Sequence, residues 1–279
     1  MKRILPLAFV LALFPEHAWA LLELGGKFVQ GGVVTGRAEP EAKIALDGRP
    51  VPVRPDGRFF LGLGRDQPPT AELVVHHPDG HVDRLSLEIA QRSYDIQRID
   101  GVPEKMVTPD EAVLARIAAD RAMVEAARAI DSPEPLFDEG FVWPVIGPIT
   151  GVYGSQRILN GEPRQPHYGV DIAAPEGTPV GAAASGRVVL AADLYFTGNT
   201  IIIDHGWGFS TTYSHLATMS VAVGEQVRQG QQIGTVGATG RATGLHLDWR
   251  INLFDVRLDP ALFVGPMPEP AEDGGPAGQ

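Results

Sequence analysis

The sequence predicts a mainly β protein, with an N-terminal small β-sandwich, a helical connector and a C-terminal glycine-rich β-barrel or sandwich. Three observations predict this class. Short apolar segments separated by Asp-Gly turns fill residues 21–100. A stretch rich in Ala, Leu, Arg and Glu, as is typical of a helix, lies within residues 101–137. Residues 138–264 return to apolar runs that are broken by glycines.

The first twenty residues have the pattern of a secretory signal peptide. Lys2 and Arg3 form a basic start, an apolar run follows, and Ala18-Trp19-Ala20 supplies small residues at a cleavage site. No later apolar run approaches the roughly 18 residues that a membrane helix needs. We therefore expect an exported protein, periplasmic or associated with the cell envelope, with no stable membrane insertion after cleavage.

The charge balance and the absence of cysteine narrow the possible partners. The chain carries 23 Lys and Arg against 34 Asp and Glu, a formal net charge of −11. Nucleic-acid binding needs basic patches, which we do not find, so a nucleic-acid partner is not expected. Because there is no Cys, the chain has neither disulfides nor a site for lipid attachment through Cys.

Residues 21–100 predict a small sandwich of immunoglobulin-like size. Asp47-Gly48, Asp56-Gly57 and Asp79-Gly80 are hairpin-type turns between apolar segments. The histidine-rich stretch 76–81 surrounds the last of these turns. We interpret it as a solvated hairpin, because no nearby residue completes a metal-ligand set. No chemistry is expected here, although a glycan- or protein-binding role for this domain stays open as an alternative main function.

The connector, residues 101–137, is predicted to contain one helix. Thr108-Pro109-Asp110-Glu111 forms a capping box, and Asp131-Ser132-Pro133 ends the helical pattern. Its apolar stripe is expected to pack on a neighbouring domain and includes Leu114, Ile117, Ala118, Ala122 and Val124. The tail, residues 265–279, is too poor in apolar residues to fold and is expected to be disordered.

Residues 244–253 predict a half-buried strand that carries functional side chains. Apolar residues alternate strictly with polar ones, and residues two apart on a strand point to the same face. His246 and Asp248 therefore present an imidazole and a carboxylate side by side. This pairing is typical of a metal site or of an acid and base pair.

A second strand, around residues 166–172, offers a matching set. His167 and Asp171 share one face, and Gly169 between them leaves that face open. Nitrogen and carboxylate oxygen donors on two rigid strands suit Zn²⁺, which accepts both ligand types and keeps one position open in catalytic sites.

A third strand offers further groups from Tyr213-Ser214-His215-Leu216. Strand alternation predicts that Tyr213 and His215 share a face, so that a phenol and an imidazole reach the same pocket. His205 ends an apolar strand and is expected to form hydrogen bonds in a turn rather than to act in catalysis.

Residues 142–260 resemble the lysostaphin-type (LytM-like) zinc metalloendopeptidases, which act on peptide cross-links of peptidoglycan. The residues that carry the resemblance are His167-x-x-x-Asp171, Tyr213-x-His215, Gly244-Leu245-His246-x-Asp248 and the glycine-rich run 223–240. The resemblance implies zinc ligands at His167 and Asp171, and it implies that His215 and His246 assist catalysis. It also implies hydrolysis of a peptide bond by water that zinc has activated.

The sequence departs from the family pattern at the third ligand. The position holds Asp248 where the family has His, and Arg250 stands where an acid is usual. In one hypothesis Asp248 replaces the imidazole as a zinc ligand, and Arg250 holds its outer oxygen. In the other, Asp248 and Arg250 only pair with each other, and the domain is a non-catalytic module that binds peptidoglycan or activates a separate cell-wall hydrolase. We favour the first hypothesis, because the other four side chains are all present.

Overall fold

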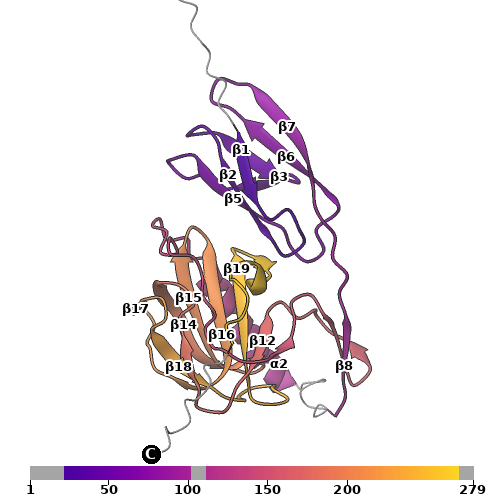
Figure 1. Ribbon diagram of the computed structural model, residues 1–279, viewed down its shortest axis with the longest axis vertical. Coiled ribbons are helices and arrows are strands. Elements are labelled where there is room, and N and C mark those ends of the chain that lie inside the picture. The colour runs from indigo at the N-terminus through magenta and orange to yellow at the C-terminus, as the bar shows by residue number, and fades with distance from the viewer. Residues whose placement is uncertain (1–21, 102–110, 270–279) are drawn as a thin grey trace, which may run out of the picture.

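The computed structural model describes residues 22–101 and 111–269, and it is mainly β, which confirms the predicted class (Figure 1). The predicted signal peptide and the capping box at 108–111, except for Glu111, lie outside the described residues. Over the described ranges, no helix combines the length and the apolar character that a membrane crossing requires.

The N-terminal part is a sandwich of two antiparallel sheets, with strand orders β1-β2-β5 and β4-β3-β6-β7. Phe59 and Leu61 of the first sheet pack against Ile44 and Leu73 of the second. The strands are β1 (Glu23–Gly26), β2 (Val33–Arg37), β3 (Lys43–Leu46), β4 (Arg49–Val51), β5 (Arg58–Gly62), β6 (Thr70–His76) and β7 (Val82–Glu88).

The predicted hairpin turns occur between these strands. Asp47 and Gly48 both have positive φ, at 48° and 75°, as a tight two-residue turn between β3 and β4 requires. The histidines around the last turn contact carboxylates: the ring of His77 lies between Glu39 and Asp83 at 3.4 and 3.1 Å. Among the described residues, this hairpin does not appear in a group that could hold a metal.

The C-terminal part is organised by one ten-stranded sheet with the central order β17-β14-β15-β16-β19-β12-β9. Its strands are β9 (Ile149–Gly151), β12 (Val170–Ala173), β13 (Pro179–Gly181), β14 (Gly186–Leu194), β15 (Gly198–Gly206), β16 (Phe209–Met219), β17 (Gln226–Val227), β18 (Gln232–Val236), β19 (His246–Leu253) and β20 (Val256–Leu258). A short 3-10 helix, η1 (Pro260–Leu262), follows. Because β16 pairs with β19 along its first half and with β18 along its second, the sheet changes partner at residue 215.

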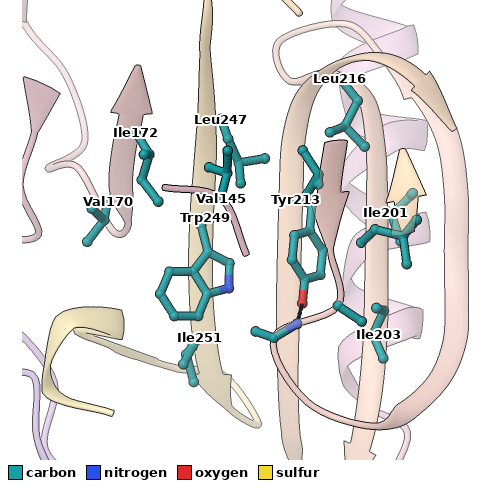
Figure 2. Packing of buried hydrophobic residues seen from close by; sticks show 14 of the residues in the cluster. Val145, Val170, Ile172, Ile201, Ile203, Tyr213, Leu216, Leu247, Trp249 and Ile251 are labelled. Atoms are coloured by element: carbon teal, nitrogen blue, oxygen red, sulfur yellow. Dashed lines mark hydrogen bonds between the residues drawn. The ribbon is translucent and has the colours of Figure 1, made fainter. Parts of the chain in front are cut away.

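The two faces of this sheet differ in chemistry. Trp249 of β19, Tyr213 of β16 and Ile172 of β12 point into one apolar core (Figure 2). The alternate residues of β19, among them Asp248 and Arg250, therefore lie on the opposite face. This alternation brings the polar side chains of three neighbouring strands to one surface.

Helix α2 (Glu111–Arg128) lies on β14 and β15. Its contact is small and centres on Ala127, which packs with Leu190 and Ile202. The predicted stripe is partly wrong, because Leu114 is 52% exposed, and Ala118 and Ala122 are also exposed. The helix contacts the sheet nearer to its C-terminal end than the apolar pattern predicts.

Two segments depart from the expected boundaries. β8 (Ile96–Ile99), inside the range predicted for the sandwich, pairs in parallel with β10 (Gln156–Leu159), which also pairs with β11 (Glu162–Pro163). At the other end, the carbonyl of Gly265 accepts a hydrogen bond from Trp143, and Met267 packs against the core. The predicted disorder is therefore wrong for the first tail residues, and residues 270–279 lie outside the described part.

The two β parts contact each other directly. Arg54 forms an ion pair with Asp131 at 2.8 Å, and the ring of Phe60 contacts Phe209 with ring centroids 5.1 Å apart. Gly62 packs so closely on Val256 that an added Cβ would lie 3.0 Å from it. These contacts place the sandwich against the segment after α2, the start of β16 and the start of β20.

His205 gives this fold a pH-dependent stability. The ring is fully buried, with Nδ1 2.7 Å from the carbonyl of Ser185 and Nε2 2.7 Å from Oγ1 of Thr211. Burial lowers the pKa of His205 to about 4 from 6.5. The unfolded chain therefore binds a proton below pH 6.5 that the folded chain rejects until about pH 4, so stability falls as the pH drops through this window.

We predict that His205→Gln weakens this pH dependence. Between pH 7.5 and 5.0 the parent should lose about 2 kcal/mol more unfolding free energy than the variant, because only the parent must keep a buried imidazole neutral. Urea unfolding at both pH values measures the difference. Equal losses in the two proteins would contradict the assignment.

Candidate metal centre and catalytic site

The candidate ligands are positioned by the pairing of β12 with β19. The register places Asp171 directly opposite Asp248, so the two carboxylates lie side by side on the polar face. His167 precedes β12, and its backbone is fixed by two hydrogen bonds, from its N–H to Ser155 and from the N–H of Gly154 to its carbonyl. The strand faces that the sequence predicts therefore meet in one place.

His167, Asp171 and Asp248 can each offer one donor atom such that all the donors lie within 4.8 Å of one another. All three residues are buried. The Nε2 atom of His167 lies 3.1 Å from Oδ1 of Asp171. Both ring nitrogens of His167 and Oδ1 of Asp171 are buried without a hydrogen-bond partner in the described structure. Buried nitrogen and oxygen donors that converge without partners fit a zinc ion.

Each carboxylate of the candidate site is held by its own arginine. Nη2 of Arg157 donates to Oδ2 of Asp171 at 2.6 Å. Nε of Arg250 donates to Oδ1 of Asp248 at 2.8 Å, and Nη2 donates to Oδ2. The pairing with Arg250 therefore leaves the first hypothesis open, because a carboxylate that accepts two hydrogen bonds still has lone pairs for a metal. Arg157 lies on β10, and no sequence motif identifies its role.

These arginines keep both carboxylates ionised. Burial alone would raise the pKa of Asp248, but the charge and hydrogen bonds of Arg250 outweigh it and hold that pKa well below its usual value. The pKa of Asp171 is also lowered: burial and the charge of Asp248 oppose ionisation, whereas the close approach of the His167 ring and the charge of Arg157 favour it. Ionised oxygens are the form that a metal requires.

Two glycines leave space for the carboxylates. A Cβ at Gly151 would lie 2.3 Å from Oδ2 of Asp171, and one at Gly169 would lie 2.7 Å from Oδ1 of Asp248. Both distances are shorter than any van der Waals contact. The space that Gly169 leaves is therefore filled by Asp248 and Arg250, and it is not open in the way that the sequence predicts.

His215 and His246 lie next to the candidate ligands. Their ring centroids are 4.9 Å apart, and Nε2 of His246 lies 3.8 Å from Oδ1 of Asp171. In each ring Nδ1 faces a carbonyl, that of Thr239 at 2.8 Å and that of Gly244 at 2.9 Å. Because a carbonyl only accepts, Nδ1 donates, and the neutral ring carries its lone pair on Nε2. Burial lowers the pKa of His215, which favours this neutral form.

The prediction for Tyr213 is wrong. Its side chain is fully buried in the core, and its hydroxyl accepts a hydrogen bond from the N–H of Ala183 at 2.7 Å (Figure 2). The strand does not continue its alternation to the next predicted residue, because His215 has a φ of 64° at the point where β16 changes partner. This local irregularity turns the imidazole to the polar face without the phenol. His205 also differs from the prediction of hydrogen bonds in a turn, because it lies within β15 and contacts Thr211 of β16.

Residues 165–260 match Peptidase family M23. The chain is 34% identical to the crystal structure of an M23 peptidase from Pseudomonas aeruginosa, with a TM-score of 0.65, and the match covers 85% of this chain and 95% of that one. It is 42% identical over 103 residues to the DD-carboxypeptidase/endopeptidase Mpg of Neisseria meningitidis. These aligned residues make up 37% of this chain and 24% of Mpg. It is 43% identical over 94 residues to the peptidoglycan DD-endopeptidase ShyC of Vibrio cholerae, 34% of this chain and 22% of ShyC. The chain thus spans 24% and 22% of the length of these two curated relatives.

We predict that Gly151→Ala weakens zinc binding about tenfold, the size of effect that disturbed outer contacts of metal ligands produce. The added Cβ must displace the carboxylate of Asp171 from its position beside Arg157. Competition with a chromophoric chelator measures the affinity. Gly265→Ala is the matched control, because a Cβ there meets nothing within 4 Å. Equal zinc affinity in both variants would show that Asp171 is not held as described.

Proposed function

The chain belongs to peptidase family M23, and on that premise we propose that it is an exported zinc endopeptidase that hydrolyses peptide cross-links of peptidoglycan. The observation that carries the proposal is the convergence of five side chains from separate strands and loops. In this proposal His167, Asp171 and Asp248 hold the metal, and His215 and His246 act in catalysis. The names of the relatives Mpg and ShyC support a peptide substrate, and that of ShyC supports peptidoglycan.

Each group has a role that follows from its position. A zinc ion held by the three buried donors would supply Lewis-acid polarisation of the scissile carbonyl and acidify a water molecule. His246 presents Nε2 beside Asp171, where it can accept the proton of the attacking water. His215, buried and neutral, presents a second Nε2 that can take or return a proton as the leaving amine departs. Arg157 and Arg250 keep the two carboxylates ionised and oriented.

The alternative is a non-catalytic module that binds peptidoglycan or activates a separate cell-wall hydrolase. One observation favours it: both oxygens of Asp248 accept hydrogen bonds from Arg250. The retained and buried positions of His167 and Asp171, with their unpartnered donor atoms, favour the enzyme. The two proposals differ in what Asp248 does.

We predict that Asp248→Ala abolishes stoichiometric zinc binding and hydrolysis together, because it removes one of three ligands and leaves Arg250 without its carboxylate. Metal analysis and chromatography of cross-linked muropeptide digests measure the two properties. Asp193→Asn, which breaks an exposed ion pair with Arg116, is the control and should change neither. If Asp248→Ala keeps both zinc and cellular function, the non-catalytic alternative is favoured.

We predict that His246→Ala retains zinc but lowers kcat by about 10² to 10⁴, the usual contribution of a positioned general base. His215→Ala should behave in the same direction. Turnover of a defined cross-linked muropeptide and metal content are measured on the same preparation. Loss of zinc with loss of activity would instead make the histidine a ligand.

A further inference from the structure

The polar face of the sheet continues past the candidate metal site as a strip along β16 and β19. Cross-strand pairs line it: Ser214 faces Asp248, Thr212 faces Arg250, and Ser210 faces Asn252. All of these residues except Arg250 are buried. Ser210, Ser214 and Asn252 each keep one side-chain oxygen without a hydrogen-bond partner in the described structure. The strip is therefore a polar region that keeps buried hydrogen-bonding groups without partners.

Three arginines from three elements cover this strip. Arg128, at the end of α2, donates from Nη2 to Oγ1 of Thr212 at 3.3 Å. Arg257 on β20 is the cross-strand partner of Asn252 and so lies on the same face, on the other side of Arg250. Arg250 pairs with Asp248, but neither Arg128 nor Arg257 has an ion pair among the described residues. Nε of Arg128 and Nη1 of Arg257 are buried without a partner.

The arginines therefore leave an excess of positive charge. Together with Arg157, four guanidinium groups face the two carboxylates of Asp171 and Asp248. Burial and the charges of Arg257 and Arg250 lower the pKa of Arg128 to about 8. This crowding occurs in a chain whose net charge is −11. Unpaired buried cations are costly, and an anion between them would offset that cost.

Arg257 also borders an open space between the two β parts. It lines a cavity of about 390 Å³ with Tyr168, Arg49 and Arg65. The ring of Tyr168, the residue after the candidate ligand His167, lies 5.9 Å from the guanidinium carbon of Arg257. The lining also contains carboxylates, of which Asp66 already pairs with Arg65 at 2.5 Å. The size is that of a site for a small ligand or a segment of peptide.

We propose that Arg128 and Arg257, on either side of Arg250, form a subsite that binds a carboxylate of the substrate peptide next to the metal centre. The inference rests on the proposed function, since it assigns this anion to the peptide that is cut. A carboxylate suits the site because its two acceptor oxygens match the forked donors of arginine, and charge-assisted hydrogen bonds of this kind are the strong ones. Arg257 then selects acidic peptides over neutral ones.

The test measures binding without turnover. The full chain carrying His246→Ala is titrated with a fluorescent, uncross-linked peptidoglycan stem peptide that has free carboxylates, and with the same peptide in which every carboxylate is a carboxamide. The proposal predicts that the acidic peptide binds about tenfold more tightly or better, which corresponds to one charge-assisted hydrogen bond. The preference should persist after zinc is chelated. Equal affinities, or a preference that vanishes with the metal, would overturn the proposal.

Variants in the same His246→Ala background locate the subsite. Arg257→Gln and Arg128→Gln should each reduce the preference for the acidic peptide, and Arg257→Lys should keep part of it. Arg228→Gln is the matched control, because Arg228 is exposed in the turn after β17, at the far edge of the sheet. If Arg257→Gln does not fold, the comparison of the two peptides on the His246→Ala chain still tests the proposal. If the chain with His246 intact and zinc bound hydrolyses no cross-linked muropeptide while the His246→Ala chain prefers the acidic peptide, the proposed function is refuted and the subsite stands.

Discussion

The site depends on the register between β12 and β19, which sets two carboxylates opposite each other in a buried place. Like charges directly opposite on neighbouring strands destabilise a sheet. At a separation of about 5 Å and an effective dielectric constant of about 20, the repulsion amounts to about 3 kcal/mol. This pairing therefore persists only if nearby positive charge compensates it. Arg157 and Arg250 supply that charge, one for each carboxylate.

The two arginines supply this charge in different ways. Arg157 donates to Oδ2 of Asp171, the oxygen that His167 does not approach, whereas Arg250 donates to both oxygens of Asp248. The inner donor atoms, Oδ1 of Asp171 and the ring nitrogens of His167, stay without partners. Each arginine orients its carboxylate, and the donor atoms without partners stay available for a divalent ion. Glycine at 151 and 169 makes this dense arrangement sterically possible.

Much of this arrangement could be predicted from local patterns. Along 246–253 the alternation correctly separates the core residues from His246 and Asp248, because a paired strand enforces a period of two, whereas Leu245 lies before β19 and is exposed. The same rule fails between Tyr213 and His215, because a residue with positive φ at 215 breaks the period where β16 changes partner. The role of Arg157 could not be predicted, since it depends on β10, whose parallel partner β8 is about sixty residues away in sequence. The arginines of the strip are likewise brought together only by the packing of α2 and β20.

X-ray absorption spectroscopy of the zinc-loaded chain tests the central claim most directly, because it counts the imidazoles around the metal. If Asp171 and Asp248 are both ligands, the spectrum will show one imidazole, from His167, and oxygen donors at about 2.0 to 2.2 Å. A spectrum with two or more imidazoles would contradict the account, because it would assign His215 or His246 to the metal in place of Asp248.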